Sequence, residues 1–344
     1  MSANETPSDD RILELTRAHF SPAADGAEVA LSPLPGGGSD RQYWRLKTAH
    51  PDRPDAPPQT AIYMHYTDAR PDNLCFITSS SILGRAGVSI PEIYAHDDAS
   101  MSIWLEDLGN FHLWDYRHEP WEIREPLYRS TLREIAKIHA LSEDSLSDTD
   151  RATLQPGFDE KLYAWEQNYF FDQFLARFSL LPAKQVTSMR DSPELNAVRA
   201  RLSSQPRALV HRDFQSQNVL IRDGHAVIID FQGLRPGRPE YDIASLLFDP
   251  YITLSPAERD SLITYYLELV PISKSTFEQN FADCAIQRLM QALGAYGYLS
   301  TQLNKTQFLR YVPRASEVVR ELVSRGLAPE PLGNALAPDS IELS

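Results

Sequence analysis

Two parts of the chain differ in the spacing of their apolar residues. The first third contains short runs rich in β-branched and aromatic residues, which are typical of strands; they cover residues 41–46, 61–66, 90–96 and 102–106. Beyond residue 107, apolar residues recur every three to four positions, as in helices with one buried face; these stretches cover residues 126–139, 158–178, 241–247, 256–269, 276–298 and 306–326. Two further helices are predicted at residues 11–20 and 73–86.

This order of elements predicts an α+β fold with two lobes. A polar segment at residues 106–109 ends the last predicted strand and is the natural hinge between them. We expect a disordered tail at residues 1–10, a small lobe with an antiparallel sheet at residues 11–106, and a large helical lobe at residues 107–344. Residues 328–344 are rich in proline and alanine and are expected to be loosely held.

A β-hairpin is predicted in the large lobe, where two apolar β-branched runs flank Asp223-Gly224. Asp-Gly is a preferred two-residue turn of hairpins. With this turn, Arg222 pairs with His225, and Asn218 lies opposite Ile229 at the open end of the hairpin. Asp230 is the next residue, so the hairpin brings an amide oxygen and a carboxylate together.

The segment before this hairpin has the residue spacing of a kinase catalytic loop. It reads His-Arg-Asp-Phe-Gln-Ser-Gln-Asn over residues 211–218, with Asp213 and Asn218 five positions apart. Asp213 can accept the proton of a substrate hydroxyl. Asn218 and Asp230 offer the hard oxygen ligands that hold Mg²⁺ on the phosphates of a nucleotide. Chance would have to produce the loop, the hairpin and the following carboxylate in this order, so a purely structural interpretation is disfavoured.

A glycine-rich segment lies directly before the predicted strand at residues 41–46 of the small lobe. Gly36, Gly37, Gly38 and Ser39 would let backbone N–H groups approach phosphate without obstruction by side chains. A flexible hairpin turn is the alternative interpretation. Because the segment precedes a kinase-type catalytic loop, we favour a role in binding the phosphates of ATP.

Composition and charge narrow the classes of partner. The formal net charge of −14 argues against nucleic acid, which would require a basic surface. The sequence has no apolar run long enough to span a membrane and no signal peptide at its polar N-terminus, so no membrane partner is expected. Cys75 and Cys284 match no metal or disulfide pattern and are expected to be buried thiols in the cytoplasm. The oligomeric state is left open.

Together these segments resemble the aminoglycoside/choline-kinase-like phosphotransferase family, a branch of the protein-kinase-like fold. The resemblance rests on residues 35–45, 105–109, 210–218, 228–232 and 239–247. The catalytic segments are most similar to those of kinases that phosphorylate N-acetylmuramate and N-acetylglucosamine at the anomeric hydroxyl. The resemblance implies ATP and Mg²⁺ as cofactors, and it assigns roles to the matching residues: Asp213 as catalytic base, Asn218 and Asp230 as metal ligands, His211 and Asp242 as supports of the loop, and Gly36, Gly37, Gly38, Ser39, Arg41, Glu106 and Leu108 as nucleotide-binding residues.

The chain departs from the kinase pattern at one place. Kinases usually carry a lysine on the third strand that pairs with a glutamate on the next helix. Neither residue is present here, in residues 61–66 or in the following helix. Arg41 or Arg45 could supply the missing cation, and a nucleotide-binding pseudokinase with a regulatory role remains an alternative.

The acceptor is expected to be a small molecule, preferably a sugar. Only eleven residues separate Asp230 from Asp242, too few for a long activation loop that would bind a peptide. Trp165 and Tyr169 could stack on a sugar ring, although burial in the helical core is the favoured interpretation for both. An aminoglycoside or choline-type acceptor is the alternative to an amino sugar.

Overall fold

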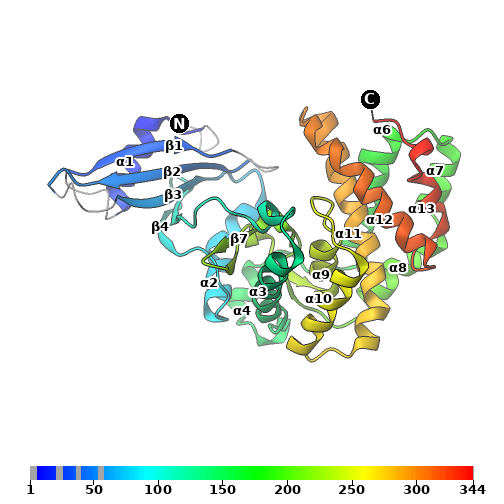
Figure 1. The fold of residues 1–344 in the computed structure, drawn as a ribbon. Helices are drawn as coiled ribbons and strands as arrows, with labels where there is room; N and C mark the ends of the chain where they lie inside the picture. Colours follow the sequence, from blue (N-terminus) through cyan, green and yellow to red (C-terminus); the bar gives the residue numbers. More distant parts are fainter. Residues whose placement is uncertain (1–5, 21–25, 36–39, 53–57, 344) are drawn as a thin grey trace.

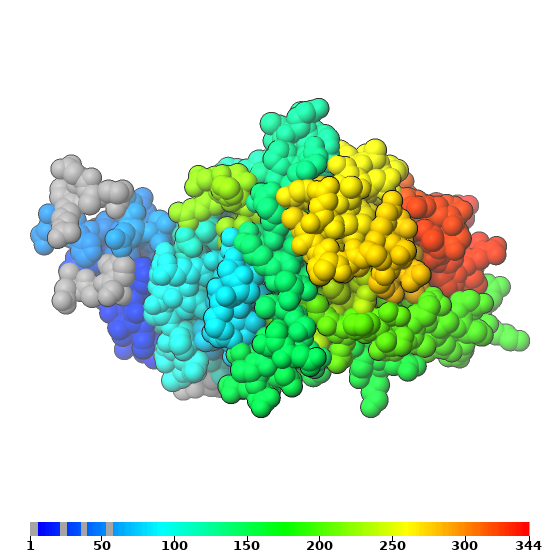
Figure 2. Space-filling model, turned by 90° about the horizontal axis from the view of Figure 1, so that it is seen from below, coloured from blue at the N-terminus to red at the C-terminus, as the bar shows by residue number. Residues whose placement is uncertain are grey.

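The computed structural model describes residues 6–20, 26–35, 40–52 and 58–343 of the chain. Figure 1 shows a sheet at one end of the molecule and a larger body of helices at the other. The space-filling view in Figure 2 shows the same elongated shape, with the N-terminal segments at one end and the C-terminal segments at the opposite end. The predicted two-lobed α+β architecture is therefore confirmed.

The small lobe is built on a five-stranded antiparallel sheet with the strand order β1-β2-β3-β5-β4. Its strands are β1 (Glu28–Pro33), β2 (Gln42–Ala49), β3 (Gln59–His65), β4 (Ile93–Asp97) and β5 (Ser102–Glu106). Four of these strands were predicted, and β1 was not. β1 lies at the edge of the sheet and exposes most of its residues, so it lacks the apolar pattern of a buried strand.

One face of the sheet is covered by α1 (Asp9–His19), which begins where the Ser8 side chain accepts a hydrogen bond from the backbone N–H of Arg11. The aromatic side chains of Trp44, Tyr63 and Trp104 pack with the buried residues of α1. Asp9 and Asp10 are helical, so the predicted tail over residues 1–10 is shorter than expected. Residues 1–5 lie outside the described part of the chain.

The small lobe also contains α2 (Phe76–Arg85), preceded by the 3₁₀ turn η2 (Pro71–Cys75). Cys75 is buried and free, and Cys284 in the large lobe is also buried and free, as predicted. Beyond β5, the chain enters the large lobe through residues 106–109.

The large lobe consists mainly of helices, most of them at the predicted positions. They are α3 (Trp121–His139), α4 (Asp148–Thr153), α5 (Glu160–Phe170), α6 (Ala176–Phe178), α7 (Ala183–Arg190), α8 (Pro193–Ser203), α9 (Pro239–Leu247), α10 (Pro256–Leu269), α11 (Lys274–Gln302), α12 (Val312–Ser324) and α13 (Glu330–Ala335). A π-helical turn, η5 (Phe171–Leu175), interrupts the predicted helix at residues 158–178. α10 begins with a capping box of Ser255 and Glu258, with Pro256 at its first position.

The predicted hairpin is formed by β7 (Val219–Arg222) and β8 (His225–Ile228). Arg222 pairs with His225, as the turn residues require. Asp223 and Gly224 have φ values of 52° and 78°, the left-handed backbone of a type I′ turn. β6 (Ala208–Val210) and β9 (Arg235–Gly237) form a second short pair that flanks the catalytic segment.

The C-terminal segment is not loosely held, which corrects the prediction for residues 328–344. Leu332, Ala335 and Leu336 are buried in the core of the large lobe. The backbone N–H of Leu180 also donates to the carbonyl of Ser340 at 2.9 Å. Among the described residues, no helix combines the length and the apolar character needed to cross a bilayer.

Candidate active site

Asp213 lies in the loop between β6 and the 3₁₀ turn η6 (Ser216–Asn218), with 48% of its side chain exposed. One carboxylate oxygen, Oδ1, accepts a hydrogen bond from Nη2 of Arg288 at 2.6 Å. The preceding residue, Arg212, has a φ of 77°, a left-handed conformation that non-glycine residues rarely adopt and that is frequent at functional sites. The fold therefore presents Asp213 to solvent while a cation fixes its orientation.

Arg288 comes from the middle of α11 and is itself buried. Its Nε donates to the Ser245 hydroxyl at 2.9 Å, so α9 and α11 together hold the guanidinium in place. Burial lowers the pKa of Arg288, but Asp213 and the neighbouring tyrosine side chains together outweigh burial and raise the pKa above its ordinary value. Arg288 therefore stays charged beside the candidate base.

Asn218 and Asp230 meet at the open end of the hairpin, as predicted. Asn218 Nδ2 lies 3.4 Å from Oδ2 of Asp230 and 2.8 Å from the carbonyl oxygen of Asp213. The backbone N–H of Ile229 donates to the carbonyl of Asn218 at 3.0 Å, which continues the hairpin ladder by one residue. The same ladder that forms the hairpin thus positions both predicted metal ligands beside Asp213.

Arg41, at the start of β2, completes this cluster from the small lobe. Its Nη2 donates to Oδ1 of Asp230 at 2.6 Å. Burial acts to raise the pKa of Asp230, but the charge of Arg41 and a hydrogen bond from Gln232 outweigh it, and the pKa lies below its ordinary value. Asp230 is therefore ionised at neutral pH, as a metal ligand must be.

Two nitrogens of the Arg41 side chain help to identify the kind of ligand that Arg41, Asn218 and Asp230 can bind. Nε and Nη1 are buried and have no hydrogen-bond partner among the described residues. Buried guanidinium nitrogens without partners are costly unless an acceptor is bound. A nucleotide phosphate between the two lobes would satisfy them, so the residues present fit a nucleotide.

The same residues also fit Mg²⁺. Among the described residues, no group of three or more His, Cys, Asp or Glu side chains could hold a metal on its own. Asn218 and Asp230 provide only two protein ligands. That number suits Mg²⁺, which typically takes one or two protein carboxylates and completes its octahedron with phosphates and water.

Asp242, in α9, stabilises the backbone of the catalytic segment. Its carboxylate is fully buried and accepts from the backbone N–H groups of His211 at 2.7 Å and Arg212 at 2.8 Å. His139 contributes a third hydrogen bond at 3.1 Å. The Nε2–H of His211 donates to the carbonyl of Ile229 at 2.9 Å and so ties the loop to the hairpin.

We expect Asp242→Ala to lower the free energy of unfolding by about 2–5 kcal/mol, because it leaves buried donors without an acceptor. Urea denaturation of both proteins measures the change. Asp172→Ala is the matched control, since Asp172 is a half-exposed aspartate in an ion pair with Arg190 and should shift the unfolding free energy by less than about 1 kcal/mol. If Asp242→Ala were as stable as the wild type, Asp242 would not stabilise the catalytic loop.

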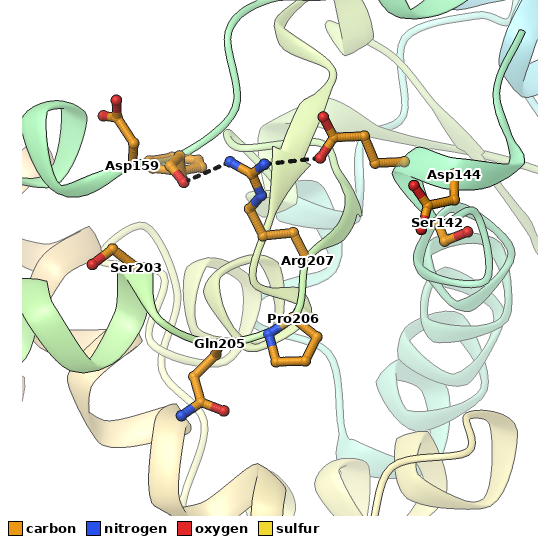
Figure 3. Close-up of a pocket in the computed structure, with 9 residues that line it drawn as sticks. Ser142, Asp144, Asp159, Ser203, Gln205, Pro206 and Arg207 are labelled. Carbon is orange, nitrogen blue, oxygen red and sulfur yellow. Dashed lines mark hydrogen bonds and ion pairs between the residues drawn. The ribbon is translucent and has the colours of Figure 1, made fainter.

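A hollow on the surface of the large lobe is lined by none of these residues. It has a volume of about 470 Å³ and is lined by residues 142–144, 158–159, 203 and 205–207. Figure 3 shows Arg207 in this hollow, where it bonds to the carbonyl of Phe158 and, at 2.9 Å, to the carboxylate of Glu143. None of the predicted catalytic residues lines it, so the candidate active site is the Asp213–Asp230 cluster.

Residues 30–275, well over half of the chain, match the model of the phosphotransferase enzyme family. The chain belongs to this family. It is accordingly a small-molecule kinase that uses an alcohol group as acceptor. The predicted resemblance and the predicted enzyme class are both confirmed.

Relatives of this kinase include characterised proteins of nearly the same length. It is 25% identical over 320 residues to the N-acetylmuramate/N-acetylglucosamine kinase of Pseudomonas aeruginosa, with 89% of this chain and 88% of that protein covered. It is 24% identical over 328 residues to the kinase of the same name from Caulobacter vibrioides, with 88% and 90% covered.

Solved structures with a similar fold include small-molecule kinases of other specificities. An ethanolamine kinase of Plasmodium vivax has a TM-score of 0.63 and 16% identity, covering 95% of this chain and 93% of that one. A macrolide 2′-phosphotransferase from Brachybacterium faecium has a TM-score of 0.55 and 13% identity, covering 96% and 98%. These likenesses show that the kinase shares their fold.

The predicted nucleotide-binding residues are only partly brought together. Gly36, Gly37, Gly38 and Ser39 lie outside the described residues. Arg41 reaches Asp230, whereas the other proposed cation, Arg45, binds Asp107 with two hydrogen bonds of 2.7 and 2.9 Å. Arg45 therefore holds the linker between the lobes, and Arg41 is the cation beside the predicted metal ligands.

Glu106 and Leu108 flank this linker. Glu106 forms an ion pair with Arg222 of the catalytic hairpin, and the side chain of Leu108 is buried. The linker is thus fixed both to β2 and to the catalytic hairpin. Its two predicted nucleotide contacts stay predictions.

The prediction that Trp165 is buried was wrong, and several residues of the site were not predicted. Trp165 is 50% exposed and stacks on Tyr169 with ring centroids 5.1 Å apart, so it is not buried in the core. Arg288 was missed, although an arginine within the apolar stretch of α11 is a detectable signal. Asp249 was also missed; burial raises its pKa to about 6, and it accepts hydrogen bonds from both the N–H and the hydroxyl of Ser216.

Proposed function

We propose that this kinase transfers the γ-phosphoryl group of ATP to the anomeric hydroxyl of an amino sugar of the N-acetylmuramate/N-acetylglucosamine type. The observation that carries the proposal is the placement of Asp213 beside the Asn218–Asp230 pair, together with Arg41, which binds Asp230 and has two buried nitrogens without a partner among the described residues. The two amino-sugar kinases similar over nearly the whole chain support the choice of acceptor.

In the proposed reaction, Asp213 binds and orients the acceptor hydroxyl. Its carboxylate takes the proton as the acceptor oxygen bonds to the γ-phosphorus and the bond to the ADP oxygen breaks. Arg288 holds the carboxylate in position through Oδ1. Mg²⁺ on Asn218 and Asp230 would neutralise phosphate charge, and Arg41 would bind phosphate oxygens through its free nitrogens.

A small acceptor is supported by the segment that follows Asp230. Residues 231–241 are buried throughout. β9 pairs with β6 in this segment, and a Cβ on Gly237 would lie 2.6 Å from a methyl carbon of Val210. The segment is therefore packed into the lobe and offers no platform for a peptide substrate.

The anomeric position is supported by the chemistry of the base. An anomeric hydroxyl is more acidic than an ordinary alcohol, so transfer of its proton to a carboxylate has a lower free-energy cost. No stronger base, such as a histidine, contacts Asp213 among the described residues; His139 and His211 are both engaged elsewhere.

The test compares free N-acetylglucosamine and N-acetylmuramate with their methyl glycosides, in which the anomeric oxygen is blocked. We expect ATP consumption with the free sugars and at least about a hundredfold less with the glycosides, since the attacking oxygen is missing. Equal turnover of free sugar and glycoside would point to another hydroxyl. Turnover of choline or an aminoglycoside in place of both sugars would refute the amino-sugar assignment.

A further inference from the structure

One buried arginine beside the catalytic loop has no acidic partner. The described residues contain six buried arginines, and five of them form ion pairs: Arg41 with Asp230, Arg124 with Glu258, Arg238 with Glu240, Arg259 with Glu321 and Arg288 with Asp213. The sixth, Arg235, is 6% exposed, and its Nε donates a hydrogen bond to the carbonyl of Gly233 at 2.9 Å. Its charge is not balanced by any carboxylate within ion-pair distance in the described chain.

A second unpaired guanidinium lies next to it. Arg212 forms no ion pair within the described residues, and its backbone N–H is the group that binds Asp242. Strand pairing sets Arg235 opposite Val210, two residues before Arg212. A Cβ placed on Gly233 would lie 4.0 Å from Cδ of Arg212, so the turn that Arg235 contacts also borders the Arg212 side chain.

The electrostatics of Arg235 show that the two charges act on each other. Burial, the main factor, and the charge of Arg212 together lower the pKa of Arg235 to about 10. Of the carboxylates that counteract this effect, Asp72 is paired with Arg70, whereas the buried Glu166 accepts hydrogen bonds only from the neutral side chains of Tyr241 and Gln287. Two arginines thus face one buried carboxylate, which leaves a local excess of positive charge within an acidic protein.

This positive site borders the space where an acceptor must lie. Arg212 directly precedes Asp213, and consecutive Cα atoms are about 3.8 Å apart. Tyr169 of α5 is close enough to Arg212 for the charge of Arg212 to oppose the rise of its pKa to about 12, which burial causes. Tyr169 stacks on Trp165 and its ring centroid lies 6.1 Å from that of Tyr298, so a cluster of aromatic rings lies near Arg212.

We propose that Arg212 and Arg235 bind the carboxylate of an anionic amino sugar, so that the kinase prefers N-acetylmuramate, with its lactyl ether, to neutral N-acetylglucosamine. This inference rests on the proposed function and adds acceptor selectivity to it. Guanidinium and carboxylate form paired, charge-assisted hydrogen bonds, which are among the strongest in proteins. A small sugar can place its anomeric hydroxyl at Asp213 and its carboxylate at the adjacent arginines.

The test measures kcat/KM for N-acetylmuramate and N-acetylglucosamine in the wild type, Arg235→Gln and Arg207→Gln. We expect a ratio of about tenfold or more in favour of N-acetylmuramate in the wild type, from a charge-assisted hydrogen bond. In Arg235→Gln the ratio should fall toward one. Arg207→Gln is the matched control, because it removes one positive charge next to β6 without touching the site, and it should keep the wild-type ratio. An unchanged ratio in Arg235→Gln would overturn the proposal.

A substrate change gives a second test that does not depend on the folding of a variant. The methyl ester of N-acetylmuramate carries one additional methyl group and no charge, and the wild type should turn it over about tenfold or more slowly than the acid. Arg235→Gln and Arg212→Gln, checked for wild-type circular dichroism, should show no further loss with the ester. If the wild type treats acid and ester alike, the two arginines do not bind the carboxylate.

The two proposals can fail separately. Turnover of free N-acetylglucosamine tests the proposed function without involving a carboxylate. If neither sugar is turned over, the proposed function fails, and calorimetric binding of N-acetylmuramate and its ester then tests the carboxylate site directly. Tighter binding of the acid would support the site, and equal binding would exclude it.

Discussion

The Asp213→Asn variant is expected to lose about 10²–10⁴-fold in turnover rate, the usual contribution of a general base. Asparagine has nearly the same shape but cannot accept the acceptor proton. The affinity for ATP should stay close to that of the wild type, because Asp213 contacts Arg288 and not the Arg41–Asp230 pair. Initial rates and equilibrium nucleotide binding, measured on the same preparations, separate the two effects.

Asp172→Asn is the matched control for this experiment. Asp172 and Asp213 are both about half exposed, with 52% and 48% of the side chain accessible, and each forms an ion pair with one arginine. The control therefore removes a similar charge and a similar ion pair at a site remote from the hairpin. A rate near that of the wild type in Asp213→Asn would show that Asp213 does not act as the base.

The hairpin and the meeting of Asn218 with Asp230 could be predicted because local chemistry determines both. Asp223-Gly224 requires a two-residue turn with positive φ, and the turn fixes the register of both strands. Once the register is set, Asn218 and Asp230 must meet at the open end. No long-range packing enters this inference.

The positioning residues could not be predicted, because each acts across a long stretch of chain. Arg288 is 75 residues from Asp213, and His139 is 103 residues from Asp242. Their roles depend on how α3, α9 and α11 pack, which the spacing of apolar residues does not specify. The unpaired state of Arg235 is likewise visible only when every carboxylate around it has been placed.

Two other errors come from composition. The Pro/Ala-rich C-terminus suggested a loose segment, but a Cβ on Gly333 would lie 3.0 Å from a methyl carbon of Val323, so α13 packs closely on α12. Trp165 suggested core because it is large and apolar, yet it is half exposed beside the candidate acceptor region. The type of a residue predicts only the average burial of that type, and residues near functional sites often depart from this average.

Arg41 is a candidate substitute for the absent strand lysine, which bears on the pseudokinase alternative. Arg41 enters from β2 and binds Asp230 directly, so a cation is present near the position where phosphates would lie. Arg41 differs from the usual kinase lysine because its partner is not a glutamate on a helix. It pairs with Asp230, which is itself a predicted metal ligand. Metal and nucleotide binding would therefore separate Arg41 from Asp230 in part and free the carboxylate for the metal.

Asp230→Asn should remove this metal binding, and we expect turnover to fall about 10³-fold or more, since a bound metal contributes several kcal/mol of charge stabilisation. Asp230 has a φ of 63°, which asparagine tolerates better than alanine, so the substitution tests the charge with little backbone strain.

In the wild type, saturating ATP with Mg²⁺ should raise the free energy of unfolding by about 2–3 kcal/mol more than ATP with EDTA. In Asp230→Asn this Mg²⁺-dependent increment should disappear. Asp223→Asn, at the exposed opposite end of the same hairpin, should keep it. If ATP with Mg²⁺ stabilises Asp230→Asn as much as the wild type, the open end of the hairpin is not the metal site, and the metal must be held by other residues.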